Sequence, residues 1–224
     1  MQQISQKNNF VYLFFSLITL LFSAAVVVEV PGSMGEDIFS LVILSMLIIS
    51  IKSLNADRTW KWTAYTIIIS FILLSIVAKL FPHHLTVYFI LLVLLVFFIR
   101  VFTIAAKQVL FVGEVDGNKI VGSLTLYILL GLIWAVIYLF ILAMDPQAFS
   151  GIEAAGWQQI FSRVAYYSFV TLTTLGYGDI LPTNRIAEFF VYMEAIIGVF
   201  YMAIIVSSLL SLHLSAMEEK KKGN

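Results

Sequence analysis

The chain contains no cysteine and few charged residues. The absence of cysteine in 224 residues excludes disulfide bonds and thiolate metal sites, although it does not indicate a compartment. Charged residues make up 12% of the sequence and the formal net charge is zero, so no overall basic character argues for nucleic-acid binding. The composition is 61% hydrophobic with a mean hydropathy of +1.01, which is more apolar surface than one soluble core could bury. The sequence therefore predicts a membrane protein with several spans.

The sequence also lacks the short motifs of common enzymes. It has no His-Glu-x-x-His pattern, no Walker-type loop and no exposed Ser-His-Asp candidates. His83 and His84 are expected in a solvated loop, and His213 lies near the inner end of the last apolar segment. We therefore expect neither enzymatic activity nor a cofactor, a small-molecule substrate or a nucleic-acid partner.

Four long apolar segments occupy the first half of the chain. Because about 20 residues cross the hydrocarbon core of a bilayer, each segment is expected to form a transmembrane helix. They cover residues 10–28, 38–51, 62–78 and 85–106. The second is short and is expected to continue to residue 54, with Lys52 reaching the interface. A cleaved signal peptide is the alternative for the first, although its apolar run is long for one and its basic region holds only Lys7.

A polar connector over residues 107–119 precedes the second half of the chain, and its Gly and Asn spacing favours a turn over a helix. A fifth apolar segment covers residues 120–144 and a sixth covers 186–217. Between them lie a loop rich in turn formers and a shorter segment, residues 157–173, that leads into a second loop. The sequence thus predicts six spans with a distinctive loop before the last one.

In this second loop glycines alternate with larger residues. Gly176 and Gly178 flank Tyr177, and Leu175 precedes them. Glycine adopts left-handed dihedrals at little cost, so this alternation lets consecutive backbone carbonyls point the same way. A ring of such carbonyls can replace the hydration shell of a potassium ion, and Thr174 can add a hydroxyl oxygen below its carbonyl.

The loop resembles the selectivity filter of tetrameric potassium channels. The residues that carry the resemblance are Thr174-Leu175-Gly176-Tyr177-Gly178, with Thr173 before them and Asp179 after them. The family has Val where this chain has Leu175, whose side chain faces away from the ions. The resemblance is specific over residues 120–214. It implies an all-α membrane protein with six transmembrane helices, a re-entrant pore helix and a filter loop that binds K⁺.

The resemblance also implies an assembly and an arrangement of domains. One loop supplies a quarter of the filter ring, so a homotetramer surrounded by membrane lipid is expected. The domains would be a four-helix peripheral domain, a cytoplasmic connector, a pore domain and a short basic tail, over residues 1–106, 107–119, 120–217 and 218–224. Ten of the thirteen Lys and Arg residues lie on the cytoplasmic side if both termini are cytoplasmic. The filter loop would then enter the cell membrane from outside.

Residues before the filter also match the family. Tyr166 and Tyr167 lie where the family has two aromatics that brace the filter tyrosine; interfacial aromatics are the alternative. Some bacterial relatives have a Glu at the position of Val170 that pairs with the filter Asp. Asp179 is therefore expected to have another partner, such as a tyrosine hydroxyl.

The sixth segment carries the candidates for gating. Gly198 matches the position where the family's inner helix bends, and close helix packing is the alternative. The same register gives the cavity-lining candidates Val199, Met202, Val206 and Ser207. An apolar gate is expected at Leu210 and Leu214.

Glu194 is unexpected, because an ionisable residue within a span is costly and is a functional candidate by default. It lies one turn before Gly198 and is expected near Ser168 or Thr171. Two interpretations remain. Glu194 is either a protonated side chain hydrogen-bonded to one of these hydroxyls or a proton-sensing modulator of gating.

Six spans with a pore loop after the fifth also resemble the layout of voltage-gated channels. Because each charge that crosses 100 mV contributes only about 2.3 kcal/mol, a sensor needs several Arg residues in the fourth span. Arg100 is alone there. The sequence therefore predicts a potassium-selective channel subunit with little intrinsic voltage dependence. A weakly selective cation channel and a non-conducting accessory subunit are the alternatives.

Overall fold

The computed structural model describes residues 9–30, 33–54, 58–81, 83–111, 117–153 and 155–222. Side chains are described up to residue 204, except those of residues 33, 58, 110 and 111.

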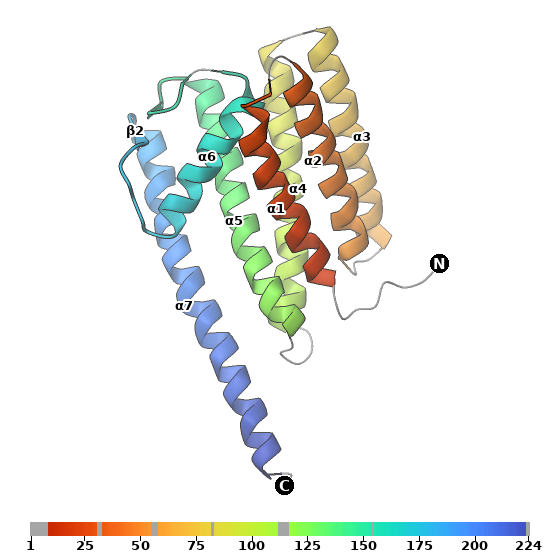
Figure 1. The fold of residues 1–224 in the computed structure, drawn as a ribbon, viewed down its shortest axis with the longest axis vertical. Helices are drawn as coiled ribbons and strands as arrows, with labels where there is room; N and C mark the ends of the chain where they lie inside the picture. Colours follow the sequence, from red (N-terminus) through yellow and green to blue (C-terminus); the bar gives the residue numbers. More distant parts are fainter. Residues whose placement is uncertain are drawn as a thin grey trace.

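Helices make up most of the described chain (Figure 1). They are α1 (Asn9–Val27), α2 (Ser33–Ser53), α3 (Arg58–Leu80), α4 (His84–Phe111), α5 (Gly117–Met144), α6 (Trp157–Leu172) and α7 (Arg185–Lys222). Two short strands, β1 (Phe149–Ser150) and β2 (Leu181–Pro182), pair antiparallel. Within the described residues, every helix except α6 is long and apolar enough to cross a membrane. The protein is an all-α membrane protein, as predicted.

Most of the expected segments are longer in the structure, and α2 and α4 illustrate the reasons. Helix α2 begins at Ser33 rather than residue 38, and its first turn contains Glu36, where a carboxylate is favourable beside the free amides of a helix start. Helix α4 continues to Phe111, which takes in part of the expected connector. Val109 explains this extension, because its side chain is buried and packing overrides a weak local preference. Residues 112–116 of the connector lie outside the described residues.

The first four helices lie against α5 and α6 of their own chain. Helix α1 packs between α2 and α5, and α4 packs on both α3 and α5 (Figure 1). Phe39 of α2 connects the two parts: its ring centroid is 5.3 Å from that of Phe161 in α6. Tyr88 of α4 donates a hydrogen bond of 2.7 Å to the carbonyl of Ala143 in α5. Helices α1–α4 therefore share one apolar core with α5 and α6.

The interior of α1–α4 is apolar. Phe71, Phe97 and Phe98 are almost fully buried there, and no described Asp, Glu, Lys or Arg side chain of these helices is buried. The buried hydroxyl of Ser50 donates to its own helix, 2.8 Å from the carbonyl of Met46, which satisfies it without a partner helix. Nothing described in this core would move a charge across the membrane.

Helix α7 contacts the end of α6 at a glycine. A Cβ atom on Gly198 would lie 2.6 Å from the carbonyl oxygen of Leu172, which is backbone and cannot turn aside. This contact supports the interpretation that Gly198 allows close helix packing. Helix α7 continues past this residue as one helix, and the structure does not test a bend.

This contact yields a prediction for Gly198→Ala. The added methyl group must push α7 away from α6, which should lower the free energy of unfolding by about 1–3 kcal/mol. Thermal unfolding of the detergent-purified protein measures the change. Gly117→Ala is the matched control, because a Cβ at Gly117 meets no atom within 4 Å. Equal unfolding temperatures for the two variants would contradict the close contact.

Candidate ion-binding site

Helix α6 ends in a hydrogen-bonded cap that begins the loop. The amide of Thr174 donates to the carbonyl of Thr171 and the amide of Leu175 donates to that of Val170, both at 2.9 Å. These two bonds form a Schellman motif with Thr173 as the C-cap. The motif requires a left-handed residue after the cap, and Thr174 has φ of 59°. The helix end therefore fixes the conformation of Thr174, the first residue of the loop.

The backbone then alternates in handedness. The positive φ angles fall at every second residue, with 59° at Thr174, 55° at Gly176 and 79° at Gly178. Thr174 is the sole non-glycine residue with positive φ in the described part of the chain. This alternation is the pattern that lets successive carbonyls face one side, as expected from the sequence for the two glycines. The left-handed Thr174 was not foreseen, because threonine is disfavoured in that region.

The loop is open on one side within a single chain. A Cβ atom at Gly176 or Gly178 would meet nothing within 4 Å. The side chains of Leu175 and Tyr177 are 53% and 65% exposed. One chain therefore leaves the loop of residues 174–178 uncovered.

The outer end of the loop is fastened to the segment before α6. Strands β1 and β2 pair Ser150 with Leu181, and the amide of Thr183 donates to the carbonyl of Ala148 at 2.9 Å. Gly151, with φ of 82°, lies against the carbonyl oxygen of Asp179 where no Cβ would fit. The two segments are thus held together just beyond the loop of residues 174–178.

Asn184 begins α7 and extends this connection. Its side-chain oxygen accepts a 2.8 Å hydrogen bond from the amide of Ala187, which is an N-cap, and its amide nitrogen donates to Asp145 at 2.8 Å. The start of α7 and the end of α5 are therefore linked through one side chain.

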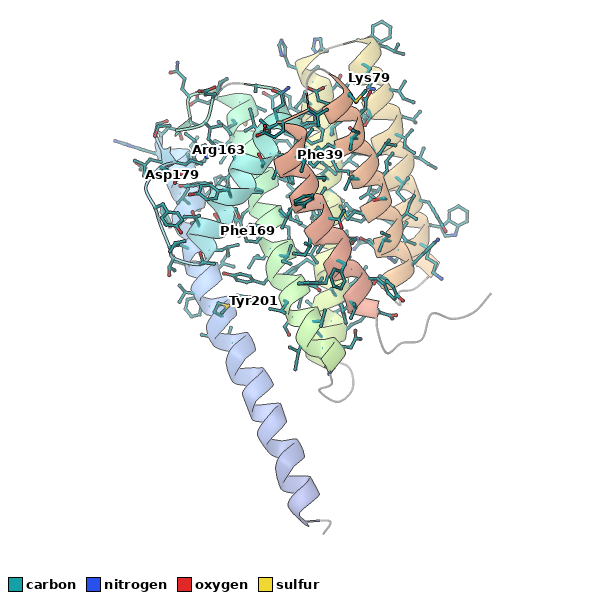
Figure 2. All side chains as sticks on the ribbon, viewed as in Figure 1. Phe39, Lys79, Arg163, Phe169, Asp179 and Tyr201 are labelled. Carbon is teal, nitrogen blue, oxygen red and sulfur yellow. The ribbon has the colours of Figure 1, made fainter. Side chains whose placement is uncertain are left out.

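Asp179 has two partners on α6. The guanidinium of Arg163 lies 3.9 Å from its carboxylate (Figure 2). The carboxylate also interacts with the hydroxyl of Tyr166 closely enough to raise the pKa of that tyrosine. Arg163 also donates to the carbonyl of Gly151 at 3.0 Å. Desolvation and the bond to Asp179 raise the pKa of Tyr166, which lies outside the six spans, so its hydroxyl stays a donor at neutral pH. A tyrosine partner for Asp179 was expected from the sequence.

Arg163 was missed as a site residue. Sequence reasoning counted it only among the external charges, but it lies three residues before Tyr166 and so on the same face of α6. Its guanidinium carbon lies 5.7 Å from the centre of the Tyr166 ring. That spacing was the signal that could have found it.

The two tyrosines of α6 have different surroundings. The ring of Tyr166 is parallel to that of Tyr177, with centroids 6.5 Å apart, as expected for a brace. Tyr167 is buried instead against Tyr138 and Phe149, at centroid distances of 5.4 and 5.5 Å. Successive residues of a helix point about 100° apart, so two neighbours cannot both face the loop of their own chain. The expectation for Tyr167 is corrected accordingly.

Glu194 lies behind the end of α6 and its side chain is 0% exposed. Its Oε1 is 2.5 Å from the hydroxyl of Ser168, and its Oε2 accepts a hydrogen bond from the hydroxyl of Tyr138. Ser168 also lies 2.8 Å from the carbonyl of Gly131, which can only accept. A hydroxyl has one proton, so if Ser168 donates to Gly131, the proton between Ser168 and Glu194 belongs to the carboxyl group. This count favours a neutral Glu194 that joins α5, α6 and α7.

The remaining candidates lie further along the chain. Thr173 is exposed, and its hydroxyl donates to the carbonyl of Phe169 at 2.6 Å. Val199 and Met202 are exposed on α7 within the single chain. The side chains of the other cavity and gate candidates lie outside the described residues: Val206, Ser207, Leu210 and Leu214.

A comparison with known protein families supports a membrane function for this region. Residues 124–213 match the model of a family described as ion channel. The match takes in most of α5, all of α6, the loop with alternating handedness, and α7 as far as residue 213. Neither the search of curated proteins nor the search of solved structures gave a match. The similarity supports an ion channel, and so an integral membrane protein, rather than an enzyme.

The hydrogen-bond count at Glu194 predicts different results for two substitutions. Glu194→Gln keeps one acceptor for Tyr138 and one donor for Ser168, so the unfolding temperature and the pH dependence of ion flux should stay unchanged. Glu194→Leu leaves the Tyr138 hydroxyl buried without a partner, which should cost about 1–3 kcal/mol of stability. Thermal unfolding and flux at several pH values measure both variants. A changed pH dependence in Glu194→Gln would favour the proton-sensing alternative.

Proposed function

We propose that the chain is one subunit of a potassium-selective channel that conducts K⁺ passively. The observation that carries this proposal is the alternating handedness at Thr174, Gly176 and Gly178. A backbone of this form offers a row of carbonyl oxygens to a dehydrated cation, and K⁺ is the ion that such filters accept. Glycine would adopt the left-handed dihedral of residue 174 at a lower energetic cost than threonine. Thr174 is strained there because its hydroxyl contributes an additional oxygen to the ion site.

Four copies would complete the ring. Irregular backbone at membrane depth is tolerated only when protein or a water-filled cavity covers it. The filter loop of one chain is uncovered, with Leu175 and Tyr177 largely exposed. In a homotetramer these side chains would pack against the neighbouring copy, while the carbonyls would face the common axis.

The inner part of the pathway follows from α6 and α7. The C-terminal end of α6 carries partial negative charge, which favours a cation below the filter. Val199 and Met202 would line the cavity there, followed by Val206 and Ser207. The apolar gate would lie at Leu210 and Leu214, and it would close by excluding water.

The orientation that we propose places the filter loop outside the cell and both termini in the cytoplasm. The starts of α1 and α5 lie together, since the amide of Phe10 donates to the side chain of Asn118 at 3.2 Å. This end of the bundle is away from the filter loop (Figure 1). Lys107, Lys119 and the C-terminal lysines are expected at the same end, in agreement with the positive-inside rule.

Ion flux from liposomes tests the proposal. The purified protein should pass K⁺ and exclude Na⁺, and Gly178→Ala should lose this selective flux. Gly178 has room for a methyl group but has φ of 79°, so the variant tests the left-handed dihedral rather than space. Gly117→Ala, which lies outside the filter, is the control.

Three other outcomes would count against the proposal. Equal flux of K⁺ and Na⁺ would indicate a weakly selective cation channel. A purified tetramer that passes no ions under any pH or voltage tested would indicate a non-conducting subunit. If Gly178→Ala kept full selectivity for K⁺ over Na⁺, the loop would not be part of the ion pathway.

The apolar core of α1–α4 predicts weak voltage dependence. Arg100 is exposed, and no described charge is buried in these helices, so the membrane field has little to move. In a planar bilayer with symmetric K⁺, the open probability should vary little over about 100 mV on either side of zero. A steep sigmoidal conductance–voltage curve would contradict this expectation.

A further inference from the structure

A cavity of about 890 Å³ lies between the four-helix domain and the outer ends of α5 and α6. Helices α2 and α3 contribute residues to its lining, and so do α4 and α5. Trp157 and Ile160 of α6 add to it near the pore. It is therefore a space between elements of the two domains rather than a defect within one helix pair.

The depth of the cavity matches one leaflet of a bilayer. Its lining extends from Glu36 to Leu44 along α2 and from Lys79 to Phe71 along α3. Eight residues of helix rise about 12 Å, compared with about 15 Å for half of the hydrocarbon core. Phe71 and Ile90, both buried, lie at the inner end. The cavity thus resembles a well that opens at the outer membrane surface.

The walls of this well are apolar. They include Leu41, Leu44, Ile72, Ile76, Val87 and Leu139. Water would find few hydrogen-bond partners among these side chains, and an empty space would lose dispersion contacts on every side. The lining therefore suits a hydrocarbon chain.

The mouth of the well is charged. Lys79 pairs with Asp37 across α2 and α3 (Lys79 is labelled in Figure 2). Glu36 accepts a hydrogen bond of 3.3 Å from Gln159, and Glu153 is exposed. The lining of the mouth thus holds three carboxylates and one ammonium group, which leaves an excess of negative charge. His83 and His84, also at the mouth, offer further ring nitrogens for hydrogen bonds.

We infer that the well binds an outer-leaflet phospholipid whose headgroup ends in a primary ammonium, such as phosphatidylethanolamine. An acyl chain would fill the apolar walls, and the ammonium group would donate to Glu36 and Glu153. The phosphate would lie beside Lys79 and the two histidines. A lipid with an anionic headgroup would lack the cation that the excess carboxylates favour. The inference requires the protein to be embedded in a membrane and does not depend on potassium selectivity.

Native mass spectrometry of the full chain tests the inference. The protein would be delipidated in detergent and then mixed with dioleoyl-phosphatidylethanolamine or dioleoyl-phosphatidylglycerol. We expect one phosphatidylethanolamine per chain to be retained, with a preference of about tenfold, equivalent to one good charge-assisted hydrogen bond. No retained lipid, or an equal or greater retention of phosphatidylglycerol, would overturn the inference.

Variants locate the lipid. Ser75→Trp fills the well from α3 and should abolish retention, whereas Ser45→Trp, on an exposed face of α2 outside the lining, should retain lipid as the unsubstituted protein does. The double substitution Glu36→Gln and Glu153→Gln should keep the lipid but remove the preference between headgroups. If Ser75→Trp retained as much lipid as the unsubstituted protein, the lipid would bind outside the well and the inference would be overturned. The same result is expected if a helix of a second copy occupies the well, because lipid would then bind elsewhere on the protein. Ion flux is not the readout, so failure here is distinct from failure of the proposed channel.

Discussion

The carbonyl of Val170 accepts hydrogen bonds from the amides of both Leu175 and Gly176, at 2.9 and 3.3 Å. This shared acceptor sets the point at which the α6 helix stops and the chain turns back. It forces Thr174 into the left-handed region, and the loop that follows continues the alternation through glycines. The rest of the protein supports this turn, because polar backbone of this kind cannot face lipid.

Two groups of contacts hold the loop from behind and from outside. Behind it, Glu194 and Gly198 bring α7 against α6, one through hydrogen bonds and the other through the absence of a side chain. Outside it, Arg163 and Tyr166 hold Asp179, and strands β1 and β2 fasten the neighbouring segments. Most of these contacts link residues of α6, α7 and the segments on either side of α6, which is consistent with a match to the ion channel family that begins only at residue 124.

Sequence patterns predicted the six spans because an apolar run long enough to cross a bilayer is rare in a soluble core. They also predicted left-handed backbone at Gly176 and Gly178, a tyrosine partner for Asp179 and the approach of Glu194 to Ser168. They did not predict the third member of that cluster, Tyr138, because nothing in an apolar helix marks which tyrosine will meet a distant carboxyl group. The cavity beside α3 was equally hidden, since a space depends on how five elements pack together. Tyr167 was misplaced because helix geometry separates it from its neighbour.

The close contact at Gly198 divides α7 into a short arm and a long arm. From this point the helix continues for 24 residues to Lys222, about 36 Å, and only 13 residues back to Arg185, about 20 Å. If the rigid helix tilts about Gly198, its end at Lys222 moves nearly twice as far as its start at Arg185. A wide swing of the end at Lys222 would then disturb the loops around Asp179 only slightly, so one end of α7 can move while the loop of alternating handedness keeps its shape.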